Sequence, residues 1–212
     1  MGPMPLDQPL TGRRLVLVEA AVAVVARAGL RGLTHRAVDA EAGLPEGTCS
    51  GYLRTRLALL TALMHHVGYT LSSDVEALSA RLAERPGDAT HAAAETTALL
   101  IRWLEQPDLI VVRTELTLEA MRQPALVEVF RPWRDALLEV VVGIVRSYGH
   151  DDPQRRAEAV LASLEGVLTL ALLRDAEERV GYATDTVGFI ISALSEHAAP
   201  PPDLSMGGAG QA

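Results

Sequence analysis

The sequence predicts an all-α fold of about nine helices, in which a small N-terminal unit of three helices precedes a larger helical domain. Ala, Leu, Val, Glu and Arg dominate the 212 residues, and all of these except Val are good helix formers. Apolar side chains recur every three or four residues between breaks at Gly and Pro, which is the helical period. No segment indicates a strand.

The first helix is expected over residues 11–28. Its apolar stripe consists of Leu15, Val18, Val22 and Val25, which share one face at helical spacing. Glycine is common just beyond a helix C-terminus because it adopts left-handed backbone angles without a steric penalty. We therefore expect this helix to stop at Gly29.

Two short helices follow the first. Thr34 is a good N-cap for the second, which we expect to end at Gly43. Pro45 is tolerated in a first helical turn, so the third helix is expected from about Pro45 to Gly51. The two short helices are thus joined by a tight turn that contains glycine.

The rest of the chain reads as long helices. Thr55 is a good N-cap for a fourth helix that ends before Pro86. Further helices are expected at roughly 88–105, 108–122, 125–148, 154–179 and 184–198, with Pro or Gly at the breaks. Residues 200–212 are rich in Pro and Gly, and we expect a disordered tail there.

Charge is distributed unevenly along the chain. The net charge is -8, which by itself argues against a nucleic-acid partner. Residues 1–69, however, carry seven arginines against five acidic side chains, so the acidic excess lies entirely in the remainder. A mildly cationic N-terminal unit on an acidic body is compatible with DNA binding by that unit.

The N-terminal segments resemble those of the TetR/AcrR family of bacterial regulators. The resemblance is carried by AGLRGLT at 28–34, AVDAEAGLPEGT at 37–48 and YLRTRLALL at 52–60, and it covers about residues 11–70 in one register. It implies a DNA-binding domain over 11–70, with the helix-turn-helix at about 34–53. It also implies a ligand-binding and dimerisation domain, here 71–199.

The same resemblance implies a function. Family members are mostly repressors that small molecules release from operator DNA, and the third helix is their recognition helix. This chain departs from the usual pattern at Cys49 and Ser50, where a leucine-tyrosine pair is common, and at Leu53 and Arg56, where phenylalanine and lysine are common. The expected partners are double-stranded operator DNA, a second copy of the chain in a homodimer, and an unknown small-molecule effector.

Roles can be assigned to the predicted DNA-binding side chains. Phosphate contacts, which position the domain without reading sequence, are expected from Thr34, Arg36, Tyr52, Arg54 and Arg56. Base-edge contacts are expected from Glu46, Thr48 and Ser50 on the recognition helix, and Gly47 and Gly51 are expected to allow close approach to the groove.

The body is expected to hold a ligand pocket and a dimer interface. A mainly apolar pocket with a few polar anchors is the usual form of a small-molecule site. The predicted pocket residues are Met64, His65, Tyr69, Thr96, Trp103, Glu115, Glu119 and Trp133. The last two helices are apolar nearly all round, which favours a symmetric interface through Leu161, Leu164, Leu168, Leu172, Ile190 and Leu194.

Other classes of protein find little support. No nucleophile elbow, phosphate-binding loop, dinucleotide fingerprint or zinc-protease motif is present, so we expect neither an enzyme nor a cofactor. His65 and His66 point about 100° apart on a helix, so we expect no metal site there. A helical scaffold protein without DNA binding is the alternative. A single cysteine, with neither an export signal nor a membrane span, predicts a cytoplasmic location.

Overall fold

The structure is a computed structural model that describes residues 9–195, with side chains to residue 193. Helices occupy nearly all of this range, and no strand occurs in it. The helices are α1 (Gly12–Gly32), α2 (His35–Glu41), α3 (Thr48–Tyr52), α4 (Arg56–Leu82), α5 (Ala89–Glu105), α6 (Asp108–Ala120), α7 (Pro124–Ser147), α8 (Pro153–Leu172) and α9 (Ala176–Ser195). The predicted all-α fold is confirmed.

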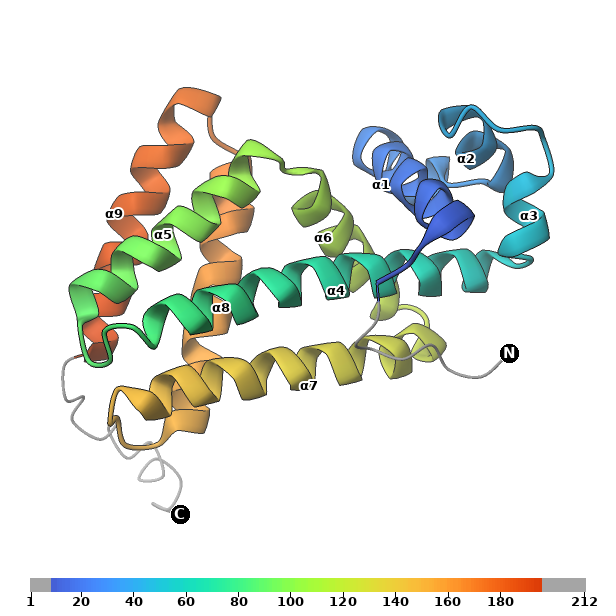
Figure 1. Cartoon of the computed structure of the whole chain (residues 1–212). Helices are drawn as coiled ribbons and strands as arrows, with labels where there is room; N and C mark the ends of the chain where they lie inside the picture. Colours follow the sequence, from blue (N-terminus) through green and yellow to red (C-terminus); the bar gives the residue numbers. More distant parts are fainter. Residues whose placement is uncertain (1–8, 196–212) are drawn as a thin grey trace, which may run out of the picture.

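Helices α1–α3 form a head at one end of the molecule, and α4 leads from it into the body (Figure 1). Helix α7 lies alongside α4, while α5, α8 and α9 complete the body. Helix α6 packs against α1, so the head is held by two elements, α4 and α6. One continuous cluster of buried apolar side chains runs from α1 through α4 and α6 to α9.

Capping side chains fix where several helices begin. The hydroxyl of Thr34 accepts from Ala37 N at 3.1 Å, and that of Thr55 accepts from Ala58 N at 3.0 Å. Each bond satisfies one backbone donor that a first helical turn leaves without an intrahelical partner. The sequence predicted both caps, and the structure confirms them.

The first and third helices differ from their predicted limits. Gly29 has φ 64° and ψ 179°, so the backbone leaves the helix there as expected, but one further turn follows before α1 ends at Gly32. Helix α3 begins at Thr48 rather than Pro45, because Gly47 has φ 94° and interrupts the helical path. Glu46 therefore lies in the turn before α3, and its predicted place on the recognition helix is wrong.

The break between the last two helices was predicted in the wrong place. It lies at residues 173–175, whereas Val180–Gly181 was expected to separate them. Arg174 N bonds to Ala171 O and closes α8, and Asp175 O accepts from Glu178 N at the start of α9. Glu177 and Glu178 fall in the first turn of α9, where acidic side chains are favoured. The expectations for residues 196–199 and for the tail at 200–212 lie outside the described range.

Candidate DNA-binding face and body cavity

A buried carboxylate anchors the short helix α3. Asp39 on α2 is 2% exposed, and its two oxygens accept from Gly47 N at 2.8 Å and Cys49 N at 2.7 Å. These are backbone donors at the N-terminus of α3, where negative charge is favoured. Asp39 thereby fixes α3 relative to α2. Sequence reasoning missed it, although an acidic residue beside Val38 in the middle of a short helix is the signal that could have found it.

Cys49 packs beneath this anchor. The side chain is fully buried, and burial, followed by the charge of Asp39, raises the pKa of its thiol to about 11. A raised pKa keeps the thiol protonated at neutral pH, and only the thiolate is strongly nucleophilic. Cys49 is therefore a core side chain rather than a reactive group.

The predicted DNA-binding residues lie between the start of α2 and the start of α4. The exposed members are Thr34, Arg36, Glu46, Gly47, Ser50, Gly51, Tyr52, Arg54 and Arg56, while Thr48 is half-buried. The Thr48 hydroxyl donates to Pro45 O at 2.6 Å and the Ser50 hydroxyl to Gly47 O at 3.0 Å. Both oxygens keep lone pairs that can accept from a base or a bound water. The segment from α2 to α4 therefore presents the short helix α3 toward solvent.

The guanidinium of Arg56, although the residue is exposed, is hydrogen-bonded to the backbone of the head. Its two terminal nitrogens donate to Leu33 O at 2.7 Å and to Leu30 O at 2.8 Å. These carbonyls belong to the link between α1 and α2, so Arg56 ties that link to the start of α4. The two bonds make Arg56 a positioning residue for the head, and its phosphate contact stays a prediction. Arg36, by contrast, has an 81% exposed side chain and only a 3.9 Å contact with Glu46.

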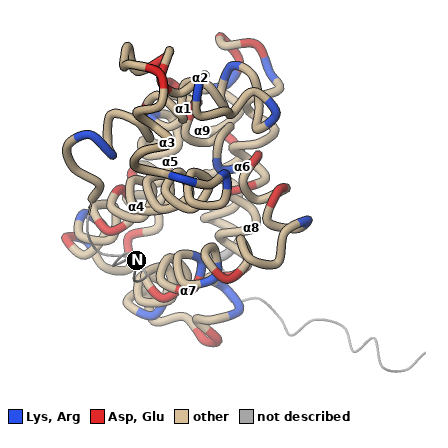
Figure 2. Tube along the Cα trace, turned by 90° about the vertical axis from the view of Figure 1, so that its right-hand side faces the viewer, with Lys and Arg blue, Asp and Glu red and all other residues tan. Residues whose placement is uncertain are grey.

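Positive and negative residues are interspersed on the end of the molecule that carries the head (Figure 2). The arginines there include Arg36 and Arg54, both exposed, while Arg27 pairs with Glu41 at 2.7 Å. Such a surface supplies a few separate cations rather than one continuous basic patch. It can contact individual phosphates on either side of a groove.

The body contacts the head directly through Glu115. This residue of α6 was predicted to line the ligand pocket, but its Oε2 accepts from Leu30 N at 3.3 Å. A Cβ on Gly29 would lie 3.7 Å from the same carboxylate. The α1–α2 link is therefore held from both sides, by Glu115 of α6 and by Arg56 of α4. Both contacts join segments remote in sequence.

A cavity of about 160 Å³ lies in the body between α4, α5, α7 and α8. One wall is a face of α4 with Leu71, Val75, Leu78 and Leu82, and the opposite walls are mostly aliphatic as well. Thr96 and Trp103, which the sequence predicted, are both among its lining residues. The Trp103 indole donates to Asp74 Oδ2 at 2.7 Å, so that polar edge is already occupied.

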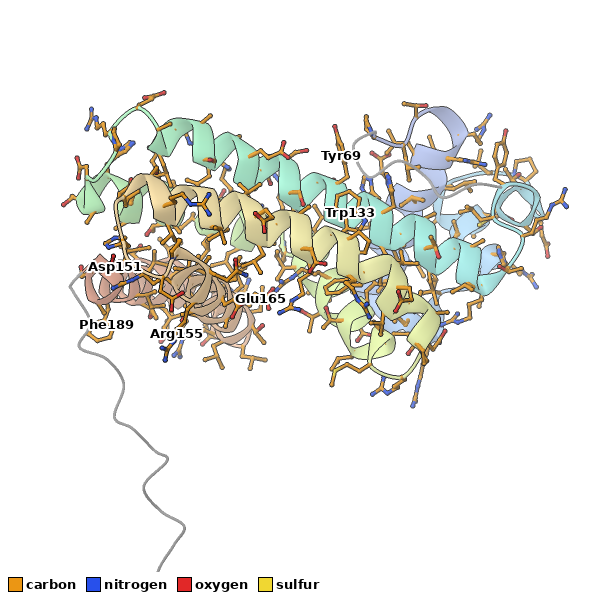
Figure 3. The ribbon with its side chains drawn as sticks, turned by 90° about the horizontal axis from the view of Figure 1, so that it is seen from below. Tyr69, Trp133, Asp151, Arg155, Glu165 and Phe189 are labelled. Atoms are coloured by element: carbon orange, nitrogen blue, oxygen red, sulfur yellow. The ribbon has the colours of Figure 1, made fainter. Side chains whose placement is uncertain are left out.

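The other predicted pocket residues lie elsewhere. Met64 and His65 are buried in the core, and the rings of His65 and Trp133 meet edge to face with centroids 5.4 Å apart. Tyr69 is half-buried on α4 (Figure 3), and Glu119 contacts Gln123 and Arg122 at the α6–α7 turn. None of these lines the cavity. The single sequence could not reveal which helical faces meet.

The ionisable groups of the cavity lie toward its two ends. Nearer the head, Arg113 Nη1 donates to Glu165 at 2.6 Å. At the far end lie Tyr148, His150 and Arg156. The Tyr148 hydroxyl and Arg113 Nε are buried and have no hydrogen-bond partner among residues 9–195. Burial, followed by the charge of Asp88, raises the pKa of Tyr148 above its usual value.

The outer surface of α8 and α9 exposes a few large apolar side chains, but they are not the ones predicted for the dimer interface. Leu161, Leu164 and Leu168 line the cavity, and Leu172 and Ile190 pack partly buried against the core, so all five are used within the chain. The side chain of Leu194 lies outside the described part. The exposed large apolar residues of α8, of α9 and of the break between them are Leu170 (51%), Leu173 (80%), Val180 (44%) and Phe189 (76%).

Comparison with known proteins agrees with this architecture. Residues 87–194 match the family described as Tetracyclin repressor-like, C-terminal domain. The chain belongs to the TetR family of transcriptional regulators. No curated protein is similar enough to match it.

Three solved structures illustrate the relation of this TetR-family regulator to known folds. A transcriptional regulator from Rhodococcus sp. Rha1 has a TM-score of 0.69 at 22% identity, covering 86% of this chain and 96% of that one. A TetR-family member from Streptomyces coelicolor A3 has a TM-score of 0.65 at 28% identity, covering 85% and 98%. The multidrug binding protein EbrR, complexed with imidazole, has a TM-score of 0.63 at 27% identity, covering 90% and 98%.

EbrR has also been crystallised with ethidium, and that structure has a TM-score of 0.58 at 26% identity, covering 84% of this chain and 98% of that one. In this regulator, none of the helices described between residues 9 and 195 is long and apolar enough to cross a membrane. Within the same range, no three His, Cys, Asp or Glu side chains are placed to hold a metal ion.

Proposed function

We propose that this TetR-family regulator is a homodimeric repressor that binds operator DNA through the head and is released by a small molecule bound in the body cavity. The observation that carries the proposal is the Asp39 anchor. The buried carboxylate of Asp39 holds a five-residue helix whose outer side is exposed. A helix so short contributes little core, so its fixed orientation is best explained by a surface that it must fit.

The proposed roles of the head residues follow from which of their side chains are exposed. Ser50 and Thr48 face a base edge, since a hydroxyl can donate or accept there and a threonine methyl can touch a thymine methyl. Arg36 and Arg54 contact phosphates, because their side chains extend from the flanking segments into solvent. Arg56 keeps the head in position and has no direct part in readout.

Dimerisation is proposed through the exposed apolar side chains of α8 and α9. Leu173 and Phe189 are large and more than three-quarters exposed, which is costly in a monomer. Phe189 projects from the outside of the body, at the end remote from the head (Figure 3). A two-fold axis beside these helices would bury the patch on both copies and leave the two heads free to enter successive grooves.

Release is proposed to act through the two contacts on the α1–α2 link. Helix α6 carries Arg113 in the cavity wall and Glu115 on Leu30 N, two residues apart. Helix α4 carries Leu71 in the wall and Arg56 on Leu30 O. Each arrangement of these helices corresponds to one position of the head. A ligand that binds one arrangement better than another shifts the equilibrium between the head positions, to an extent set by that difference in affinity.

The experiment is selection of bound duplexes from a random pool by the purified full-length chain. We expect a palindromic or pseudo-palindromic site with half-sites related by the dimer axis, and an affinity that falls steeply as salt rises. Recovery of no enriched sequence by a folded dimer at low salt would contradict the proposal. A competing scaffold function would give that outcome.

A further inference from the structure

The charged side chains that line the body cavity already have partners. Nearer the head, Arg113 Nη1 donates to Glu165 Oε1 at 2.6 Å. At the far end, Arg156 Nε donates to Asp151 O at 3.0 Å, and both Arg156 and His150 have further interactions of their own. Figure 3 shows Asp151 at the far end and Glu165 nearer the head. The charges of the lining are therefore in use within the protein.

A ligand that carries a charge would enter this cavity at a cost. An ion that moves from water into an apolar enclosure loses its hydration, and only a group of opposite charge recovers that loss. Charges of both signs also act at the far end. Arg156 lines it, while burial, followed by the charge of Asp88, raises the pKa of Tyr148, so a carboxylate acts on the same hydroxyl. These conditions favour a neutral ligand over an ion of either sign.

Two buried hydrogen-bond donors of the lining remain without an acceptor in the described part of the chain. These are the hydroxyl of Tyr148 at the far end and Nε of Arg113 nearer the head. The raised pKa of Tyr148 keeps the proton on its hydroxyl at neutral pH, and a guanidinium can only donate. A buried donor without a partner costs free energy, which an acceptor on a ligand would recover. The ligand should therefore carry an acceptor oxygen.

The remainder of the cavity requires a small apolar body. The α4 wall from Leu71 to Leu82 spans about 16 Å of helix axis, and its lining side chains are aliphatic. Leu137, Val141 and Ile144 continue the apolar surface on α7. The volume of about 160 Å³ is close to that of an apolar cavity of about 150 Å³ that takes benzene. A ligand that fits this space is small and mostly hydrocarbon.

We propose that the effector is a small neutral molecule with an apolar body and a carbonyl or ether oxygen, which accepts a hydrogen bond from the Tyr148 hydroxyl. The apolar body extends from that oxygen along the α4 wall toward the head. The inference rests on the proposed function, because it names the chemical class of the molecule that the regulatory cavity takes. The ion pair of Arg113 with Glu165 stays closed when the ligand is bound.

The test compares three seven-carbon molecules that differ in the charge of the polar group: 2-heptanone, heptanoate and heptylammonium. Binding to the full-length protein is measured by calorimetry without DNA at neutral pH. The ketone is expected to bind tightest, and each ion at least about tenfold more weakly, which corresponds to roughly 1.4 kcal/mol. An ion that binds as tightly as the ketone, or a ketone that does not bind, would overturn the proposal.

A tyrosine pair tests the hydrogen bond. Tyr148→Phe is expected to weaken 2-heptanone about tenfold and to leave toluene, which has no oxygen acceptor, unchanged. Tyr182→Phe serves as the control and should keep both affinities, because Tyr182 stacks with Arg174 and does not line the cavity. An unchanged ketone affinity in Tyr148→Phe, or an equal loss for toluene, would contradict the assigned hydrogen bond.

A glutamate pair tests whether the closed ion pair excludes charged ligands. Glu165→Gln leaves Arg113 without its carboxylate, and we expect heptanoate to gain affinity relative to the ketone. Glu158→Gln on the same helix changes an exposed carboxylate that contacts Gln154 and does not line the cavity, so its ratio should match that of the wild type. An unchanged ratio in Glu165→Gln would show that charge pairing is not the source of the preference.

Operator binding separates this inference from the proposed function. Saturating 2-heptanone is expected to weaken binding of the full-length protein to its selected operator. Ketone binding that leaves operator affinity unchanged would refute the ketone class as effector. Failure of operator selection while the ketone preference holds would refute the DNA-binding proposal alone.

Discussion

Asp39 is the single side chain on which the orientation of α3 depends most. Removing its two acceptors in Asp39→Ala leaves Gly47 N and Cys49 N unpaired, one of them fully buried. We expect the free energy of unfolding to fall by about 2–4 kcal/mol, measured by urea denaturation. Glu41→Ala on the same helix removes only an exposed ion pair with Arg27 and should change stability much less. Similar losses in both variants would contradict the anchor.

Gly68 shows how one missing side chain sets the spacing of two helices. A Cβ there would lie 2.7 Å from Cδ2 of Trp133, so α4 meets the indole of α7 at its backbone. We expect Gly68→Ala to lower the free energy of unfolding by about 1–3 kcal/mol through this clash. Gly143→Ala, with nothing within 4 Å, should be neutral or stabilising because alanine favours the helix. A stabilised Gly68→Ala protein would refute the close approach.

At the scale of elements, the connection between body and head can be broken at one hydrogen bond. Glu115→Ala removes the acceptor for Leu30 N, and we expect operator affinity to fall about tenfold because the head is no longer held in one position. The measurement is fluorescence anisotropy with the selected operator. Glu115→Gln retains an acceptor oxygen and should lose less.

Glu119→Ala is the matched control for this helix. It lies one turn further along α6 and contacts Gln123 and Arg122 rather than the head. Its operator affinity should remain close to that of the wild type. If Glu115→Ala behaved in the same way, the α6 contact would have no part in positioning the head.

The elements that could be predicted from the sequence are those governed by local chemistry. Thr34 and Thr55 cap their helices through bonds to residues three positions later, and Gly29 breaks α1 through its own backbone angles. The start of α3 was missed because Gly47 adopts φ 94° within a segment expected to be helical, and Asp39 from another helix accepts from its N–H. The short break at residues 173–175 was missed because it contains neither Gly nor Pro.

The candidate sites show the same difference between features set by local sequence and features set by packing. The predicted DNA-binding residues of the head lie in one continuous segment of the sequence, and the structure leaves nearly all of them exposed. The cavity is assembled from helices that are distant in sequence, so only Thr96 and Trp103 of the expected residues line it. Leu161 and Leu168 are apolar enough for either a cavity or an interface, and only the rotation of α8 distinguishes these positions. Helix rotation is a property of the packed molecule.

For the whole molecule, the exposed face of α8 and α9 should determine the oligomeric state. Phe189→Glu places a charge in the proposed interface, and we expect a monomer at micromolar concentration in sedimentation experiments, with operator affinity lost. Met121→Glu is a suitable control because Met121 is 78% exposed but lies at the end of α6. A Phe189→Glu protein that remains dimeric would place the interface elsewhere.

The proposed function requires the exposed face of α2 and α3 to bind duplex DNA, and a salt titration measures that binding. The wild type, Ser50→Ala and Arg36→Ala are compared on the selected duplex and on a scrambled one. Ser50→Ala should reduce the preference between duplexes, whereas Arg36→Ala should weaken both equally and reduce the salt slope by about one. A folded wild-type dimer that binds neither duplex at low salt, or variants indistinguishable from it, would contradict DNA binding by this face.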